Sequence, residues 1–255
     1  SPRPLEAGVL APNPDGPVAA TLDPAWYAST RLLGYQLPAA QNTAFATWET
    51  EIEDYLATMD PPWESYGLSC QTTSAERTYY DGPHALYQRF AHRGGAPAYR
   101  RAREEAVWYR ENEITWYAGD TVALYSCASS WDPSEPLDWG DMRRMLGQGM
   151  LDDYLVTGDP EALATVRGLG EAFRQNLAAL TTGGEITVKV TERNMAWPMM
   201  GLASYYAVDA TPDVESALMT LVDMTVAWQA EGSSGAFEHD INRPAPDECG
   251  DGPNG

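Results

Sequence analysis

The fold is decided by residues 157–180, which read TGDPEALATVRGLGEAFRQNLAAL. Asp159 is a residue type that caps a helix N-terminus, and Pro160 suits the first helical position after such a cap. Apolar residues then recur every three or four positions, as in an amphipathic helix with one buried stripe: Leu163, Val166, Leu169, Phe173, Leu177 and Leu180. The stretch therefore predicts a tight turn followed by a long amphipathic helix.

The same unit recurs along the chain. Three predicted helices each run into a short turn: residues 82–93, 139–157 and 194–209. A proline opens the second helix after each turn, at positions 97, 160 and 212, and residues 24–59 are the candidate for a degenerate first copy. Helical hairpins of this size stack side by side, because each has a face that it cannot bury alone. The sequence therefore predicts an all-α protein of stacked helical hairpins.

The connections between hairpins are much longer than those within them. They cover residues 60–81, 114–138 and 182–193, and an irregular tail follows residue 231. Because successive helices alternate in direction, we expect the long connections to emerge at one end and to form the functional face. The third connection contains the alternating run ITVKV, which predicts a short β element near residues 185–191.

Composition limits the classes of partner. The 255 residues carry a formal net charge of −21, which disfavours nucleic acid and anionic membranes as partners. No apolar run is long enough to span a bilayer, so no membrane insertion is expected. We divide the chain into an extended segment, a hairpin domain and an acidic tail rich in Pro and Gly: residues 1–22, 23–231 and 232–255.

The N-terminus and the cysteines indicate a secreted or cell-surface protein. The chain begins Ser1-Pro2 without an initiator Met or an apolar signal segment, as a processed protein does. Cys70 and Cys127 both lie in long connections at the predicted functional end, so they are the candidate disulfide, and Cys249 is left over. Extracellular compartments are oxidising, which suits such a bridge.

Aromatic and acidic residues gather in the long connections and at the helix starts that follow them. Flat rings stack on sugar faces, which makes four tryptophans candidates for substrate binding: Trp63, Trp131, Trp139 and Trp197. The alternative is that these rings pack the loops together. Asp81 and Glu192 are candidates for the two carboxyl groups that a glycoside hydrolase needs, and the alternative for such acids is helix capping.

A second set of residues suits a polysaccharide lyase. Tyr80 and His84 could remove a proton beside a uronate carboxylate, while Arg193 and Asn194 neutralise and bind the acid group. A hydrogen-bonded structural histidine is the alternative. The short motifs of zinc hydrolases, nucleotide-binding proteins and serine-triad enzymes are absent from suitable contexts. No cofactor is required, although the tail acids Asp247, Glu248 and Asp251 are oxygen ligands of the kind that calcium prefers.

Two stretches resemble front helices of an (α/α) toroid. They are RNMAWPMMGL at residues 193–202 and DGPHALY at residues 81–87, each running into a turn before a proline. Over roughly residues 80–230 the chain is similar to the six-hairpin glycosidase and polysaccharide-lyase superfamily. That superfamily closes a ring of five to seven hairpins, whereas this chain offers three clear hairpins and a candidate fourth. The resemblance implies an incomplete (α/α) toroid or barrel.

Two functions follow from these patterns. The first is a secreted carbohydrate-active protein, a glycoside hydrolase or a polysaccharide lyase, that acts on a polysaccharide or oligosaccharide through its aromatic and acidic loop face. The alternative is a non-catalytic extracellular structural or surface-assembly protein, in which the hairpins are building blocks and the tails contact neighbouring copies.

Overall fold

A computed structural model shows a protein built mainly from α-helices, as predicted. It describes residues 23–35, 37–41, 44, 46–58, 81–125, 145–182, 185–186, 190–231 and 240–241. Of the regions set out above, the first 22 residues and most of the acidic tail therefore lie outside the described residues. Within the described residues, no helix combines the length and the apolar character that crossing a bilayer requires.

The three predicted hairpins are all present. They are α3 (Gly82–Arg93) with α4 (Ala96–Trp108), α6 (Gln148–Thr157) with α7 (Pro160–Leu180), and α8 (Glu192–Val208) with α9 (Pro212–Glu231). Of the helix predicted over residues 139–157, the structure shows α6 from Gln148 onward, and residues 139–144 lie outside the described residues. Residues 145–147 are buried but not helical, and the N–H of Leu146 donates to the Tyr109 hydroxyl at 2.9 Å. This tertiary hydrogen bond ties the segment before α6 to Tyr109.

Two further helices precede the hairpins. Asp23 caps α1 (Pro24–Thr30) through a side-chain bond to the N–H of Ala25. A 3-10 turn, η1 (Ala39–Gln41), leads to α2 (Ala46–Thr58). Tyr27 of α1 packs edge-on against Phe90 of α3, with ring centroids 5.4 Å apart. These helices occupy the place of the degenerate first copy and cover α3.

The structure also contains short antiparallel strand pairs. After a π-helical turn, η4 (Tyr109–Glu113), strands β1 (Ile114–Tyr117) and β2 (Val122–Tyr125) form a hairpin that the sequence analysis treated as part of a long connection. The strands β3 (Thr181–Thr182) and β4 (Glu185–Ile186) pair with each other, and β5 (Val190–Thr191) pairs with β6 (Asp240–Ile241). The β element predicted near residues 185–191 is thus divided between two separate ladders.

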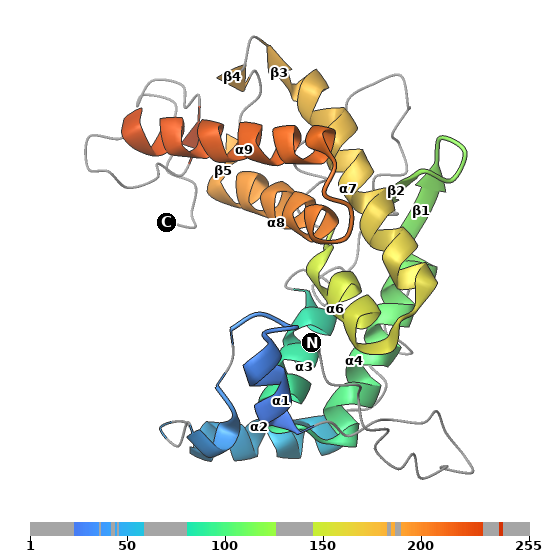
Figure 1. The fold of residues 1–255 in the computed structure, drawn as a ribbon, viewed down its shortest axis with the longest axis vertical. Helices are drawn as coiled ribbons and strands as arrows, with labels where there is room; N and C mark the ends of the chain where they lie inside the picture. Colours follow the sequence, from blue (N-terminus) through green and yellow to red (C-terminus); the bar gives the residue numbers. More distant parts are fainter. Residues whose placement is uncertain are drawn as a thin grey trace, which may run out of the picture.

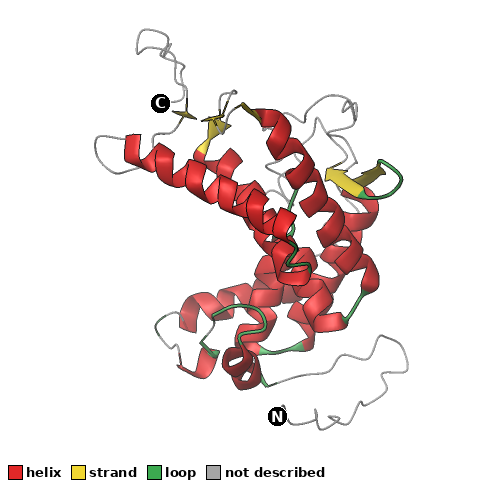
Figure 2. Ribbon diagram, turned by 45° about the horizontal axis from the view of Figure 1, so that its top comes forward, coloured by secondary structure: helices red, strands yellow, loops and turns green. Residues whose placement is uncertain are grey.

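The helices follow a curved path through the molecule. Figure 1 shows α1 and α2 at one end, α6 in the middle and α9 at the other end. The turned view in Figure 2 shows the same succession of helices as an arc. The two ends of this arc lie far apart, so the described helices do not close into a ring. The relation to an (α/α) toroid stays a prediction.

Close packing between α7 and α8 depends on glycine. A methyl group at Gly201 would lie 2.1 Å from the Cε2 atom of Phe173, whose ring is fully buried. Likewise, a methyl group at Gly170 would lie 2.4 Å from the ring of Tyr205. In each helix, one glycine therefore leaves space for an aromatic ring of the neighbouring helix. This close approach brings the second and third hairpins into contact.

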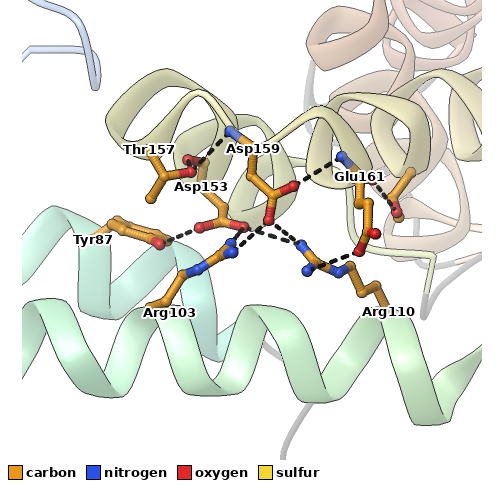
Figure 3. Close-up of polar contacts among 8 residues, drawn as sticks. Tyr87, Arg103, Arg110, Asp153, Thr157, Asp159 and Glu161 are labelled. Carbon is orange, nitrogen blue, oxygen red and sulfur yellow. Dashed lines mark hydrogen bonds and ion pairs between the residues drawn. The ribbon is translucent and has the colours of Figure 1, made fainter. Parts of the chain in front are cut away.

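A buried network of charges joins the first hairpin to the second (Figure 3). Asp153 of α6 is fully buried, and it accepts hydrogen bonds from the Tyr87 hydroxyl of α3 and the guanidinium of Arg103 of α4. Arg103 also donates to Asp159 in the turn between α6 and α7, and Arg110 of η4 donates to the same carboxylate at 2.7 Å. Each buried charge thus has a partner of opposite charge, which buried charges require.

Acid should weaken this network by protonating the carboxylate of Asp159. Burial alone would raise the pKa of Asp159, but hydrogen bonds from Arg103, from the N–H of Glu161 and from Arg110 lower it from 3.8 to about 2. A carboxyl group with a lowered pKa stabilises the folded protein above its unfolded pKa, and this contribution is lost as the pH falls through the folded value. We therefore expect the difference in unfolding free energy between wild type and Asp159→Asn to shrink from pH 4 to pH 2. Urea unfolding across this range measures it, and a constant difference would contradict the assignment.

Candidate functional site

A pocket of about 240 Å³ lies where α3, α6 and α8 meet the turn after α1. Its polar lining consists of His84 and Gln88 from α3, Gln148 and Asp152 from α6, and Ser204 from α8. Leu151, Leu155 and Met200 contribute apolar surface. A concave site with a few converging polar groups on an apolar wall is the usual form of a ligand pocket.

His84 and Asp152 form the central pair of the pocket. The Nδ1 atom of His84 lies 2.6 Å from the Oδ2 atom of Asp152. Because a carboxylate can only accept a hydrogen bond, Nδ1 carries the proton, and Nε2 has no hydrogen-bond partner among the described residues. The His84 side chain is 31% exposed and the Asp152 side chain 7%. Both side chains line the pocket, and the imidazole is the more accessible of the two.

Burial and charge shift both members of this pair. Burial alone would lower the pKa of His84, but the hydrogen bond and negative charge of Asp152 raise it above its ordinary value. Burial raises the pKa of Asp152, against hydrogen bonds from His84 and Gln88 that lower it. Both shifts favour keeping a proton on the pair. A histidine oriented in this way by a carboxylate is suited to accept or donate a proton near neutral pH.

Asp81 lies beside this pair, but its carboxylate oxygens accept hydrogen bonds from backbone N–H groups. It is 3% exposed, and its two oxygens accept the N–H of His84 at 3.2 Å and the N–H of Gly149 at 3.0 Å. A methyl group at Gly149 would lie 2.3 Å from Asp81 Oδ1, so the approach requires glycine. Asp81 thus caps α3 and ties it to the start of α6, in the capping arrangement that the sequence analysis gave as the alternative. This fixes the position of His84 relative to Asp152.

The other predicted site residues fall into three groups. Glu192, Arg193 and Asn194 form the first turn of α8, but their side chains lie outside the described part of the structure. Trp197 is half-buried and packs against the hydrophobic core. Outside the described residues lie Tyr80, Trp63, Trp131, Trp139, Cys70, Cys127 and the tail acids Asp247, Glu248 and Asp251. Of the six predicted catalytic residues, the structure therefore brings together Asp81 and His84.

The sequence analysis missed Asp152, the partner of His84. The sequence did indicate a buried, paired acid at this position. Asp152 and Asp153 lie among the apolar residues Met150, Leu151 and Leu155 of one short helix. Adjacent acids within an apolar stretch are rarely buried unless they are paired. Gln88, Gln148 and Ser204 carried no comparable signal, because uncharged polar residues are common on any helix.

A second histidine of α3 has a different role. His92 Nε2 lies 2.9 Å from Glu49 Oε1, and Arg89 pairs with the same carboxylate. Glu49 is 6% exposed and belongs to α2. Burial would raise the pKa of Glu49, but the contacts with Arg89 and His92 lower it. This group holds α2 against α3 and takes no part in lining the pocket, which makes His92 a matched control for His84.

Comparisons with protein-family models, curated proteins and solved structures found no match. Among the described residues, no group of three or more His, Cys, Asp and Glu side chains is arranged to hold a metal ion.

Proposed function

We propose that this protein is carbohydrate-active: it binds a saccharide in the pocket between α3, α6 and α8, and His84 is its acid/base residue. The observation that carries the proposal is the contact between His84 and Asp152, which orients an accessible imidazole in a pocket whose other polar groups, from Gln88, Gln148 and Ser204, are uncharged. Amides and hydroxyls both donate and accept hydrogen bonds, as sugar hydroxyls do. The acidic, cysteine-containing sequence is the support for an extracellular setting.

The proposal assigns the proton transfer to His84 and a positioning role to Asp81. Both Asp81 oxygens are occupied by backbone N–H groups, so this carboxyl group is poorly placed to attack or protonate a ligand. Neutral His84 Nε2 can take the proton from the carbon beside a uronate carboxylate while the neighbouring glycosidic C–O bond breaks, as in a lyase. Protonated His84 can instead protonate the leaving oxygen while water adds to the sugar carbon, as in a hydrolase. Asp152 stabilises the imidazolium formed in the first case.

Binding to the pocket can be observed directly through the histidines. The chain has only three, at positions 84, 92 and 239, so substitution of each by Gln assigns the imidazole NMR signals. We expect the ring signals of His84 to shift when mono- and oligosaccharides are titrated into the full chain, and those of His92 to stay in place. We also expect His84 to titrate above 6.5 without ligand, the direction in which Asp152 shifts its pKa. Saccharides that leave the His84 signals unchanged would contradict the proposal.

One observation favours the alternative of an assembly protein. Met219 and Val226 of α9 are 47% and 59% exposed, and they lie seven residues apart, which places them on one side of the helix. This helix ends the described array (Figure 1). An assembly role requires self-association of the full chain, and sedimentation as a single copy would remove this alternative.

A further inference from the structure

A tight turn after α1 forms one wall of the pocket. The N–H of Gly34 donates to the carbonyl of Arg31 at 3.0 Å, and Gly34 has a φ of 85°. Gln88 Nε2 donates to the carbonyl of Leu33 at 2.9 Å, which anchors the turn to α3 one helical turn beyond His84. Leu32, Leu33 and Gly34 all line the pocket. The turn is thus attached to the same helix that carries the proposed acid/base residue.

Tyr35 follows this wall directly and faces solvent. Its residue is 76% exposed, the largest exposure among the large hydrophobic residues that the structure describes. Since consecutive Cα atoms lie about 3.8 Å apart, the backbone of Tyr35 adjoins the pocket lining at Gly34. The Cζ atom of Arg31 lies over the Tyr35 ring, 5.8 Å from its centroid. This cation–π contact holds the ring from one side, while the exposure shows that most of its surface is open.

The pocket is too small to enclose a ligand of several sugar units, so a longer ligand must extend beyond it. A volume of about 240 Å³ is below the roughly 300 to 1,000 Å³ of sites that enclose drug-sized ligands. It suits a single sugar unit. Any further unit must lie outside the pocket, and Tyr35 follows the pocket-lining Gly34 directly in the chain.

We propose that Tyr35 is a second subsite and that the ligand is a neutral oligosaccharide of at least two units. This inference rests on the proposed function in its hydrolase form, because a lyase of the kind described above needs a uronate. One unit binds beside His84, and the next stacks its apolar face on the open face of the Tyr35 ring. We infer a neutral class because a formal net charge of −21 repels polyanions. In addition, among the described residues the pocket lining contains Asp152 but no Lys or Arg.

Affinities of matched sugars test this inference. Calorimetry on the full chain would compare monosaccharides with cello-, xylo-, malto- and mannotetraose, using wild type, Tyr35→Ala, Tyr35→Phe and Trp48→Ala. Trp48 is a matched control because it is also exposed, at 60%, but lies on α2, whereas Tyr35 directly follows the pocket-lining Gly34. We expect Tyr35→Ala to weaken binding of the preferred tetrasaccharide about threefold to tenfold, the size of one aromatic stacking contact, and to leave monosaccharide affinity unchanged. Tyr35→Phe and Trp48→Ala should match wild type.

The possible failures are distinguishable. If His84 responds to monosaccharides and Tyr35→Ala leaves tetrasaccharide affinity unchanged, the second subsite is wrong and the proposed function stands. An equal loss for mono- and tetrasaccharides also overturns the subsite, because the substitution would then act on the pocket itself. A tetragalacturonate that binds more tightly than every neutral tetrasaccharide overturns the neutral class. If no saccharide binds wild type, the proposed function fails together with the inference.

Discussion

Replacing His84 with Gln is expected to lower kcat for the saccharide substrate by about 100-fold to 10,000-fold, the usual contribution of a general acid or base. Glutamine keeps a polar side chain of similar reach but cannot exchange a proton near neutral pH. The assay first identifies a substrate for wild type, by measuring new reducing ends and unsaturated uronate products from a panel of polysaccharides. The variant is then measured on that substrate. His92→Gln provides the control, because His92 lies on the same helix and contacts Glu49 instead of the pocket.

A pH profile separates proton transfer from a purely structural role. The charge of Asp152 raises the pKa of His84, whereas burial acts in the opposite direction. Asp152→Asn removes the charge and retains the shape, so we expect the limb of the kcat profile that reports His84 to move to lower pH. The direction is the same whether the neutral or the protonated imidazole is active. A His84→Gln variant with wild-type turnover, or an unshifted limb in Asp152→Asn, would show that His84 is not the acid/base residue.

Replacing Asp153 with Ala is expected to lower the free energy of unfolding by about 3–5 kcal/mol, the typical effect of removing one partner from a buried ion pair. The Asp153 side chain is fully buried, so its loss leaves the Tyr87 hydroxyl and part of the Arg103 guanidinium without their acceptor. Arg110 Nη1, whose side chain is 9% exposed, also loses a carboxylate 3.6 Å away. Native domains have unfolding free energies of roughly 5–15 kcal/mol, so a loss of this size is large and measurable by urea unfolding.

Glu161→Ala is the matched control for this network (Figure 3). Glu161 Oε2 lies 3.1 Å from Arg110 Nη2, but the Glu161 side chain is 72% exposed. An exposed ion pair contributes about 0–1 kcal/mol because water screens the charges. We therefore expect Glu161→Ala to stay within about 1 kcal/mol of wild type. Equal losses for the two variants would mean that burial of Asp153 does not decide the strength of the network.

Much of the helical architecture was predictable from local patterns. The apolar spacing after Pro160 predicted α7, and Pro212 after the third turn predicted the start of α9. The structure begins both helices at these prolines. The β1–β2 hairpin was not predicted, since each strand has only four residues. Its position depends on contact with α7, where a methyl group at Gly168 would lie 2.6 Å from the Trp116 ring. A strand pair that depends on such a contact has no strong signal in its own sequence.

For the candidate site, the separation in sequence decided what could be predicted. Asp81 and His84 lie three residues apart at a helix start, so local reasoning named both. Asp152 is 68 residues from His84, and the turn that carries Tyr35 is 49 residues before it. Such pairings depend on how the hairpins stack, so no pattern in either segment specifies its partner.

The sequence by itself determined the helical class, the three hairpins with their turns, and the strong negative charge, because periodicity, capping and composition act over a few residues at a time. Only the tertiary structure decided that His84 meets Asp152, that Asp81 holds two backbone segments, and that Asp153 joins two hairpins. Those contacts are set by close packing between helices, for example where Gly149 admits Asp81 and Gly201 admits Phe173. Packing of this kind depends on the shapes of both surfaces at once.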